Sequence, residues 1–307
     1  MGTYKYIFGP IPSRRLGRSL GIDLDPVKVC SEDCVFCQIG RTTEKTLERK
    51  EWVPLGDVLE EFAAWRQEGV DCDFVTLSGN GEPTLHTGFG DVLRAAKAAG
   101  YKTAVLSNGS LMWNPNVRRD AALADVVKVT VSAWDEPSFA RMHRPAHGLT
   151  FERLVSGISA LRQEFSGQLW VETMILPGFN DRKEDIQKIA ACIRPLRPDA
   201  IHLNTVTRPS RSADGILEAE NAAWLHTIAP LFEPVADVPQ FHGKIRPFSA
   251  MVDHEIVELI ARHPLPLDAI AAATGESQDA IARRLAPIRD IDIVDGIALV
   301  RDVAASE

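Results

Sequence analysis

The chain has 307 residues, of which 45% are hydrophobic and 25% charged, and its formal net charge is −8. This is the composition of a folded globular protein, and the length suits one large domain with one small one. The sequence shows no apolar run of the roughly 18 residues that cross a bilayer, no secretory leader, and no positive charge excess for nucleic acid. We expect a cytoplasmic protein that does not enter the membrane.

Short apolar runs alternate with amphipathic helical stretches over residues 1–240. The runs, each followed by polar or glycine residues, are residues 20–24, 74–77, 103–106, 126–131, 169–175 and 200–204. Apolar residues recur between them at helical spacing, and Gly69 and Gly100 are expected to end two of the helices. Strands that alternate with helices run parallel and are joined by right-handed crossovers. The pattern predicts an α/β domain built on a parallel sheet, either flat or closed into an open barrel.

The pattern changes after residue 240. Three amphipathic helices, marked by Ile256, Ile270 and Leu285, precede an alternating segment across Asp295-Gly296, a dipeptide that favours a two-residue hairpin. This order predicts a small winged helix-turn-helix domain over residues 241–307. Residues 245–307 contain six basic and eleven acidic residues, a net charge of −5 that would repel DNA phosphates. We therefore expect this domain to dock on a protein or to cover a substrate, and not to bind DNA.

The most informative segment is a cysteine loop, in which Cys30, Cys34 and Cys37 form a C-x3-C-x2-C pattern. Three thiolates on one short loop can hold three irons of a [4Fe–4S] cube and leave the fourth iron without a protein ligand. An open iron invites an exogenous ligand. The alternative is a structural zinc ion completed by His86 or His143, although neither histidine has the spacing of a zinc finger.

Two motifs together resemble the radical S-adenosylmethionine (radical SAM) superfamily. The cysteine pattern carries an aromatic residue, Phe36, before its last cysteine and follows the first strand. Residues 78–85, Ser-Gly-Asn-Gly-Glu-Pro-Thr-Leu, follow the second strand, where the family has Gly-Gly-Glu-Pro; Asn80 replaces the first of the paired glycines. The resemblance implies an enzyme with a partial (β/α)6 TIM-like barrel, a [4Fe–4S] cluster on the three cysteines and SAM on the fourth iron.

The same resemblance implies a set of residues around SAM. Near the cluster, Phe36 would supply an aromatic ring. Gly79 and Gly81 would supply backbone acceptors, and Glu82 would supply a carboxylate. Asn108 and Ser132 follow the third and fourth strands, beside the methionine and ribose positions of the family. For these two residues the alternative is turn formation or helix capping, and Asp135 is also typical of a helix start. The isolated Cys72 and Cys192 are interpreted as free core cysteines.

A closer resemblance connects residues 8–17, 81–85, 142–145 and 178–181 with the radical enzymes grouped with wyosine synthase, which rebuilds a methylated guanine in tRNA. It implies a tRNA base as the substrate, and the radical SAM resemblance implies a flavodoxin or ferredoxin-type reductant. A basic rim at the open end of the barrel would suit such a substrate, the alternative being a scattered solvated surface. Its members are Arg14, Arg15, Arg18, Lys28, Arg141, His143, Arg144, Arg208 and Arg211.

Two other functions remain open from the sequence. The first is an activase that installs a radical on a partner protein and uses the acidic C-terminal domain for docking. The second is an iron–sulfur transcriptional sensor that binds DNA through the winged helix. The acidic C-terminus and the Gly81-Glu82-Pro83 segment both argue against the sensor.

Overall fold

A seven-stranded sheet forms the centre of the molecule. The computed structural model describes residues 4–25, 27–206, 221–238, 256–257, 260, 265–288, 291–294 and 296–300. The strand order is β1-β2-β5-β6-β7-β8-β9, and every pair is parallel except β1 with β2. The parallel strands are β2 (Gly17–Ile22), β5 (Phe74–Leu77), β6 (Lys102–Leu106), β7 (Val126–Thr130), β8 (Gln168–Met174) and β9 (Ala200–Asn204). Adjacent strands follow chain order, which confirms the predicted partial (β/α)6 barrel.

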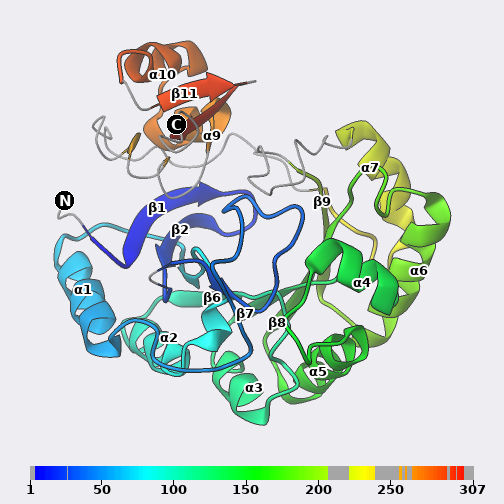
Figure 1. The fold of residues 1–307 in the computed structure, drawn as a ribbon. Helices are drawn as coiled ribbons and strands as arrows, with labels where there is room; N and C mark the ends of the chain where they lie inside the picture. Colours follow the sequence, from blue (N-terminus) through cyan, green and yellow to red (C-terminus); the bar gives the residue numbers. More distant parts are fainter. Residues whose placement is uncertain are drawn as a thin grey trace.

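Helices cover the outer side of the curved sheet (Figure 1). They are α1 (Leu55–Gln67), α2 (Phe89–Ala98), α3 (Pro115–Ala121), α4 (Glu136–His143), α5 (Phe151–Glu164), α6 (Lys183–Ile193) and α7 (Ala222–Ile228), with short 3-10 turns at Pro83–Leu85, Arg194–Leu196 and Ala229–Leu231. Gly69 and Gly100 follow α1 and α2 with φ of +70° and +87°, the left-handed conformation that glycine adopts without strain. Both predicted helix ends are therefore confirmed.

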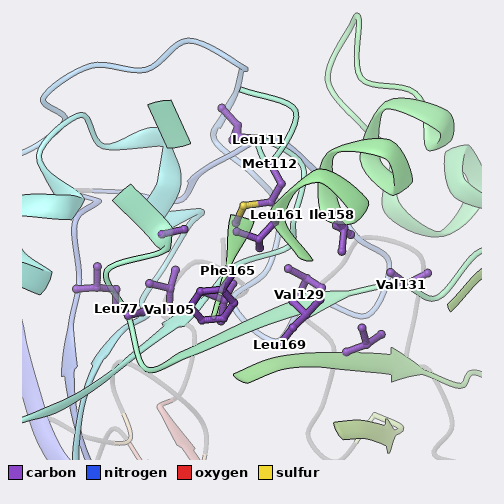
Figure 2. Packing of buried hydrophobic residues seen from close by; sticks show 14 of the residues in the cluster. Leu77, Val105, Leu111, Met112, Val129, Val131, Ile158, Leu161, Phe165 and Leu169 are labelled. Atoms are coloured by element: carbon purple, nitrogen blue, oxygen red, sulfur yellow. The ribbon is translucent and has the colours of Figure 1, made fainter. Parts of the chain in front are cut away.

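The two faces of the sheet differ in chemistry because alternate residues of a strand point to opposite sides. The outer face is apolar: Val129 and Leu169 are fully buried and belong to the same cluster as Ile158 and Leu161 of α5 (Figure 2). On the inner face a second apolar cluster lies near the amino ends of the strands. It contains Leu16, Ala104 and Val126, with Phe74, Leu106 and Trp170 packed against it. This cluster fills the inner face of the barrel at that end.

An antiparallel edge strand, β1 (Ile7–Ser13), was not among the predicted elements. Gly9, Pro10 and Pro12 interrupt its apolar pattern, and proline is tolerated in a strand only where the missing N–H faces away from a partner. After β1, the hydroxyl of Ser13 accepts hydrogen bonds from the backbone N–H groups of Arg15 and Leu16, at 3.4 and 3.2 Å. The resulting turn directs residues 14–16 toward the inner face.

The C-terminal module has its own core. It contains α9 (Leu267–Thr274), α10 (Gln278–Leu285) and the strands β10 (Leu265–Pro266), β11 (Ile291–Val294) and β12 (Ile297–Val300), ordered β10-β12-β11. Val294 pairs with Ile297, so the predicted hairpin is confirmed. Ile11 of β1 packs against the module's core, which places the module beside β1 (Figure 1). Of the first predicted helix, residues 251–255 and 258–259 lie outside the described residues. The name winged helix and the boundary at residue 240 therefore stay predictions.

Among the helices that the structure describes, none combines the length and the apolar character needed to cross a bilayer.

Candidate functional site

Backbone pairing holds the cysteine loop in a compact form. Cys30 lies in β3 (Val29–Cys30), which pairs with β4 (Glu44–Lys45) at the far end of the loop. Within the loop, Cys37 N–H donates to the carbonyl of Cys34 at 3.1 Å. The ammonium of Lys28, a buried residue, donates to the carbonyl of Gly40. The loop is therefore a preformed structure, and all three cysteines belong to it.

The end of α4 packs against this loop through three backbone hydrogen bonds. Asp33 N–H donates to the carbonyl of His143 at 3.0 Å, Val35 N–H to that of Met142 at 2.9 Å, and Ala146 N–H to that of Ser31 at 2.8 Å. Val35 and Met142 also form a small apolar cluster with Leu176 and Val206, which follow β8 and β9. These contacts place the loop over the carboxyl ends of the parallel strands, where such folds hold their ligands.

The chemistry of the thiols fits a metal centre. Burial, followed by the charges of Glu82 and Glu32, raises the pKa of Cys30 well above its usual value. Burial and then Glu32 do the same for the pKa of Cys34. Without a cation these thiols stay protonated, so metal binding must release their protons. A positively charged iron cluster is the kind of group that would stabilise thiolates in this buried, acidic surrounding.

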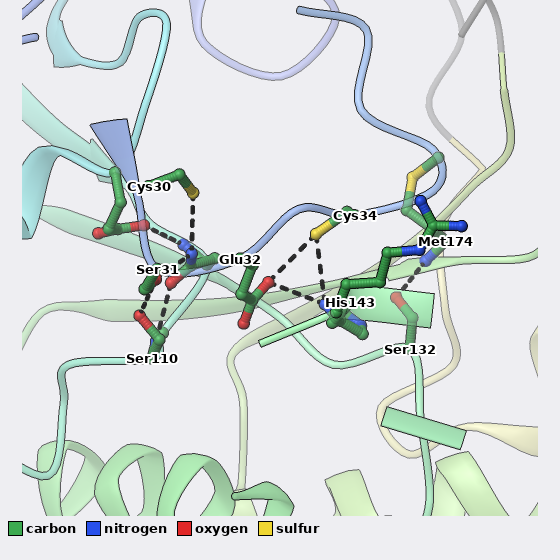
Figure 3. A network of polar contacts seen from close by, with 12 residues as sticks. Cys30, Ser31, Glu32, Cys34, Ser110, Ser132, His143 and Met174 are labelled. Carbon is green, nitrogen blue, oxygen red and sulfur yellow. Dashed lines mark hydrogen bonds and ion pairs between the residues drawn. The ribbon is translucent and has the colours of Figure 1, made fainter. Parts of the chain in front are cut away.

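A buried acid–imidazole pair lies beside the loop. Glu32 and His143 are each 1% exposed, and Nδ1 of His143 lies 2.9 Å from Oε2 of Glu32 (Figure 3). The thiol of Cys34 donates to the same oxygen at 3.2 Å and lies 3.6 Å from the imidazole. These three ligand atoms lie within 4.8 Å of one another, so this corner offers a set of metal-ligating groups.

His86 and His143, the two alternative zinc ligands, have different surroundings. Nε2 of His86 lies 2.8 Å from the carbonyl of Val53, and its Nδ1 accepts from Gly88 N–H at 3.0 Å. Both ring nitrogens are used inside the protein, so His86 is wrong as a zinc ligand. His143 does approach a cysteine of the loop. Its ring also packs between Phe36, at 5.4 Å between centroids, and Phe139, at 5.1 Å.

Glu82 connects the loops that follow β5 and β6. Its carboxylate accepts hydrogen bonds from the hydroxyls of Thr84 and Ser107, at 2.6 and 2.7 Å, and from Asn108 N–H at 2.7 Å. Burial raises the pKa of Glu82, and the hydrogen bonds from Thr84, Asn108 and Ser107 oppose that shift. In this structure the carboxylate supports neighbouring loops, and its contact with a ligand stays a prediction.

Two glycines permit neighbouring groups to approach the backbone closely. A Cβ on Gly81 would lie 1.9 Å from the carbonyl oxygen of Val29, and one on Gly79 would lie 2.2 Å from the carboxylate of Asp23. Asn80, which replaces a family glycine, donates to that carboxylate from its backbone N–H and side-chain amide, at 3.2 and 2.7 Å. The segment is therefore fixed against the end of β2, on the same side as the cysteine loop.

Asn108 and Ser132 have different surroundings. The side-chain amide of Asn108 donates to the hydroxyl of Ser31 at 2.8 Å and to the sulfur of Cys30 at 3.6 Å, so Asn108 lies at the cysteine loop. Ser132 is fully buried, and its hydroxyl accepts from Met174 N–H at 2.9 Å (Figure 3). The Asp135 carboxylate caps α4 by accepting from Ser138 N–H, as its alternative interpretation predicted. Whether Ser132 contacts a ligand stays a prediction.

The expected basic rim is not one continuous surface among the described residues. Lys28 and His143 are buried, and Arg15 forms an ion pair with Glu172 on the inner face. The guanidinium of Arg141 donates to the carbonyl of Phe179. Lys28 and His143 have partners inside the fold because buried charges and polar groups must be compensated, whereas Arg141 is exposed. Arg208 and Arg211 lie outside the described residues.

The two isolated cysteines lie away from the loop. Cys72 is buried, and burial raises the pKa of its thiol to about 12. Cys192 is half-buried, and its sulfur lies 3.7 Å from the carbonyl of Trp134. Both are free thiols, as the sequence predicted.

Comparison with known proteins identifies relatives of this arrangement. The model of the radical SAM superfamily matches residues 24–191. A UPF0026 protein of Methanocaldococcus jannaschii is 32% identical over 278 residues, 88% of this chain and 86% of that protein. An isethionate sulfite-lyase activating enzyme of Nitratidesulfovibrio vulgaris is 36% identical over 124 residues, 40% of this chain and 38% of that protein. The structure of TYW1 with a lysine–pyruvate adduct bound shares the fold, with a TM-score of 0.56, 18% identity, and coverage of 75% of this chain and 76% of that one.

Proposed function

The chain belongs to the radical SAM superfamily of enzymes, which use a [4Fe–4S] cluster and SAM, and from this premise we propose that Cys30, Cys34 and Cys37 hold the cluster. The observation that supports this assignment is the preformed loop, in which the half-buried thiols of Cys30 and Cys34 lie near the acids Glu32 and Glu82. When bound and reduced by one electron, the cluster and SAM supply a 5′-deoxyadenosyl radical that abstracts a hydrogen atom from the substrate.

The residues of this chain position and shield that site. Asn108 donates to the sulfur of Cys30 and would stabilise negative charge on it. Glu82 fixes the backbone of Asn108 and orients Ser107, so the loops after β5 and β6 keep one geometry. Phe36, packed on the ring of His143, and Val35 cover the loop with apolar surface and exclude water.

The substrate that we propose is a base in tRNA. The support is the set of segments shared with the wyosine-synthase group, namely residues 8–17, 81–85, 142–145 and 178–181, together with the fold shared with TYW1. The reductant would be a flavodoxin or ferredoxin-type protein, as the radical SAM resemblance implies. The buried Lys28 and His143 cannot contribute to RNA binding, so the contacts must come from other basic residues.

A second candidate is an activase that forms a radical on a partner protein. The observation in its favour is the 36% identity with an isethionate sulfite-lyase activating enzyme, over 40% of this chain. The acidic C-terminal module would then be a docking surface. A DNA-binding sensor has no comparable support.

The test is anaerobic reconstitution with iron and sulfide, followed by reduction with dithionite and measurement of 5′-deoxyadenosine. We expect SAM cleavage by the wild type and by the control Cys192→Ala, and none by the triple variant Cys30→Ala/Cys34→Ala/Cys37→Ala. Stimulation of cleavage by bulk tRNA supports the tRNA base, whereas stimulation only by a protein partner supports the activase. Absence of cleavage by the iron-loaded wild type would contradict the proposal.

A further inference from the structure

An ionic cluster of largely buried side chains lies on the inner face of the barrel. Lys128, Glu172 and His202 come from the neighbouring strands β7, β8 and β9, and Glu172 and His202 are paired in register. The guanidinium of Arg15 and the ammonium of Lys128 contact the two carboxylate oxygens of Glu172, at 2.7 and 2.9 Å. We call Arg15, Lys128, Glu172 and His202 the inner ionic cluster.

The position of this cluster is fixed by its neighbours along the strands. Trp170 belongs to the apolar cluster near the amino ends, and Glu172 is the next residue of β8 on the same face. Leu176, which follows β8, contacts the cysteine loop through Val35. The inner ionic cluster therefore lies between an apolar layer on one side and the cysteine loop on the other. A barrel interior is usually filled by layers of apolar side chains, so an ionic layer here is unusual.

The inner ionic cluster carries an excess of positive charge. Burial would raise the pKa of Glu172, but Arg15 and Lys128 outweigh it and hold this pKa well below its usual value. Burial, with Arg15 next, lowers the pKa of His202 to about 4, so its ring is neutral at pH 7. Two cations thus face the carboxylate of Glu172, and the charge of the exposed Asp237, whose backbone pairs with His202, also acts on the histidine. Arg14 approaches from the same turn, 3.5 Å from Oδ1 of Asn204, and the charge of Asp268 in α9 acts on it.

Two buried polar atoms of this cluster have no hydrogen-bond partner among the described residues. They are Nη1 of Arg15 and Nδ1 of His202, and His202 is 6% exposed. A buried polar group without a partner costs about 1–3 kcal/mol, which a suitable ligand would recover. An excess cation with a free guanidinium nitrogen fits an oxyanion, because guanidinium donates two parallel hydrogen bonds to carboxylate or phosphate.

We propose that the inner ionic cluster binds the carboxylate or phosphate group of a small substrate, beneath the cofactor, with Arg15 and Lys128 as its ligands. This inference rests on the proposed radical chemistry, because it assigns the cluster to the substrate of that site. The location inside the barrel favours a small molecule over the backbone of a polymer.

The test is isothermal calorimetry on the reconstituted wild type with two probes, inorganic phosphate and malonate. Lys128→Gln leaves the Arg15–Glu172 pair electrically balanced and removes the excess charge, so we expect binding of the preferred probe to weaken about tenfold or more. Lys128→Arg retains the charge and should restore most of the affinity. The matched control is Lys97→Gln, because Lys97 forms an exposed ion pair with Asp125 on the outer side.

The outcomes separate this inference from the proposed function. Tighter binding of phosphate or of malonate identifies which oxyanion the substrate carries. Failure of the wild type to bind either probe, or equal affinity in the wild type and Lys128→Gln, overturns the inference. SAM cleavage by the wild type without any anion is measured in parallel, and its absence contradicts the proposed function whatever the calorimetry shows. Circular dichroism of each variant checks that it is folded.

Discussion

The two faces of the barrel sheet are built from alternate residues of the same strands, yet they differ in what they bury. The outer face buries apolar side chains against helices, as Val129 and Leu169 do against α5. The inner face and the loops at its carboxyl end bury acids, amides and thiols, among them Glu172 and Glu82. Apolar packing needs no ligand, whereas buried charges need partners. The outer face therefore stabilises the fold, and the inner face is where we propose that the chemistry takes place.

The largest expected effect comes from removing an outer-face side chain. Leu169→Ala leaves a cavity beneath α5, and we expect it to lower the free energy of unfolding by about 2–5 kcal/mol. The measurement is urea unfolding followed by circular dichroism, with iron content per folded chain determined in parallel. Unchanged iron content would support the division between the two faces. A loss of iron from a folded variant would contradict this division of roles between the two faces.

Asp25 lies three residues after β2, and its ionisation tests how the buried polar side affects stability. Burial, then the charges of Asp23 and Glu82, raises the pKa of Asp25 to about 9. The folded protein thus retains a proton that the unfolded chain releases near its usual pKa of about 4, so folding stability falls as pH rises from about 4 to about 9. Asp25→Asn should remove this contribution, making the variant the more stable protein by up to roughly 3 kcal/mol at pH 8. A pH-independent difference in urea midpoint would contradict this account.

Glu82 tests whether a buried carboxylate supports the site. Glu82→Gln replaces one accepting oxygen by an NH2 group, which cannot accept the hydrogen bond from Asn108 N–H. We expect a loss of about 1–3 kcal/mol of stability and weaker SAM binding by the cluster-loaded protein. The measurements are thermal unfolding and calorimetry with SAM. A stability loss with unchanged SAM affinity would restrict Glu82 to a structural role.

Ser132 should give the smallest effect. Its hydroxyl accepts from Met174 N–H, so Ser132→Ala leaves that backbone group without this acceptor and should cost about 1 kcal/mol. If the hydroxyl serves only the fold, SAM affinity in the same calorimetric assay will equal that of the wild type. A several-fold loss of SAM affinity would instead place Ser132 among the ligand-binding residues.

The sequence predicted most of the outer face. Apolar periodicity located all six parallel strands, and residues 74–77 and 200–204 match β5 and β9 in both bounds. Periodicity failed for β1, because Pro10 and Pro12 are allowed at a sheet edge but resemble a loop in the sequence. Burial of a continuous apolar face leaves a local signal, and that signal suffices for strands and helices.

The sequence predicted less of the inner face, because its partners are distant in the chain. The spacing of Cys30, Cys34 and Cys37 is local and was visible. The Glu32–His143 pair joins residues 111 positions apart, and Arg15 reaches Glu172 only once the sheet is formed. The sequence does contain one indication of the inner ionic cluster. Lys128 and Glu172 are charged residues inside otherwise apolar strands, where a charge requires a partner.

The central claim is that three cysteines hold a [4Fe–4S] cluster whose fourth iron is open to SAM. The most direct measurement is electron paramagnetic resonance of the dithionite-reduced, reconstituted protein with and without SAM. We predict the signal of a reduced [4Fe–4S] cluster that changes when SAM is added and that is absent from the triple cysteine variant. A cluster signal insensitive to SAM, or zinc bound at these cysteines in place of iron, would contradict the account.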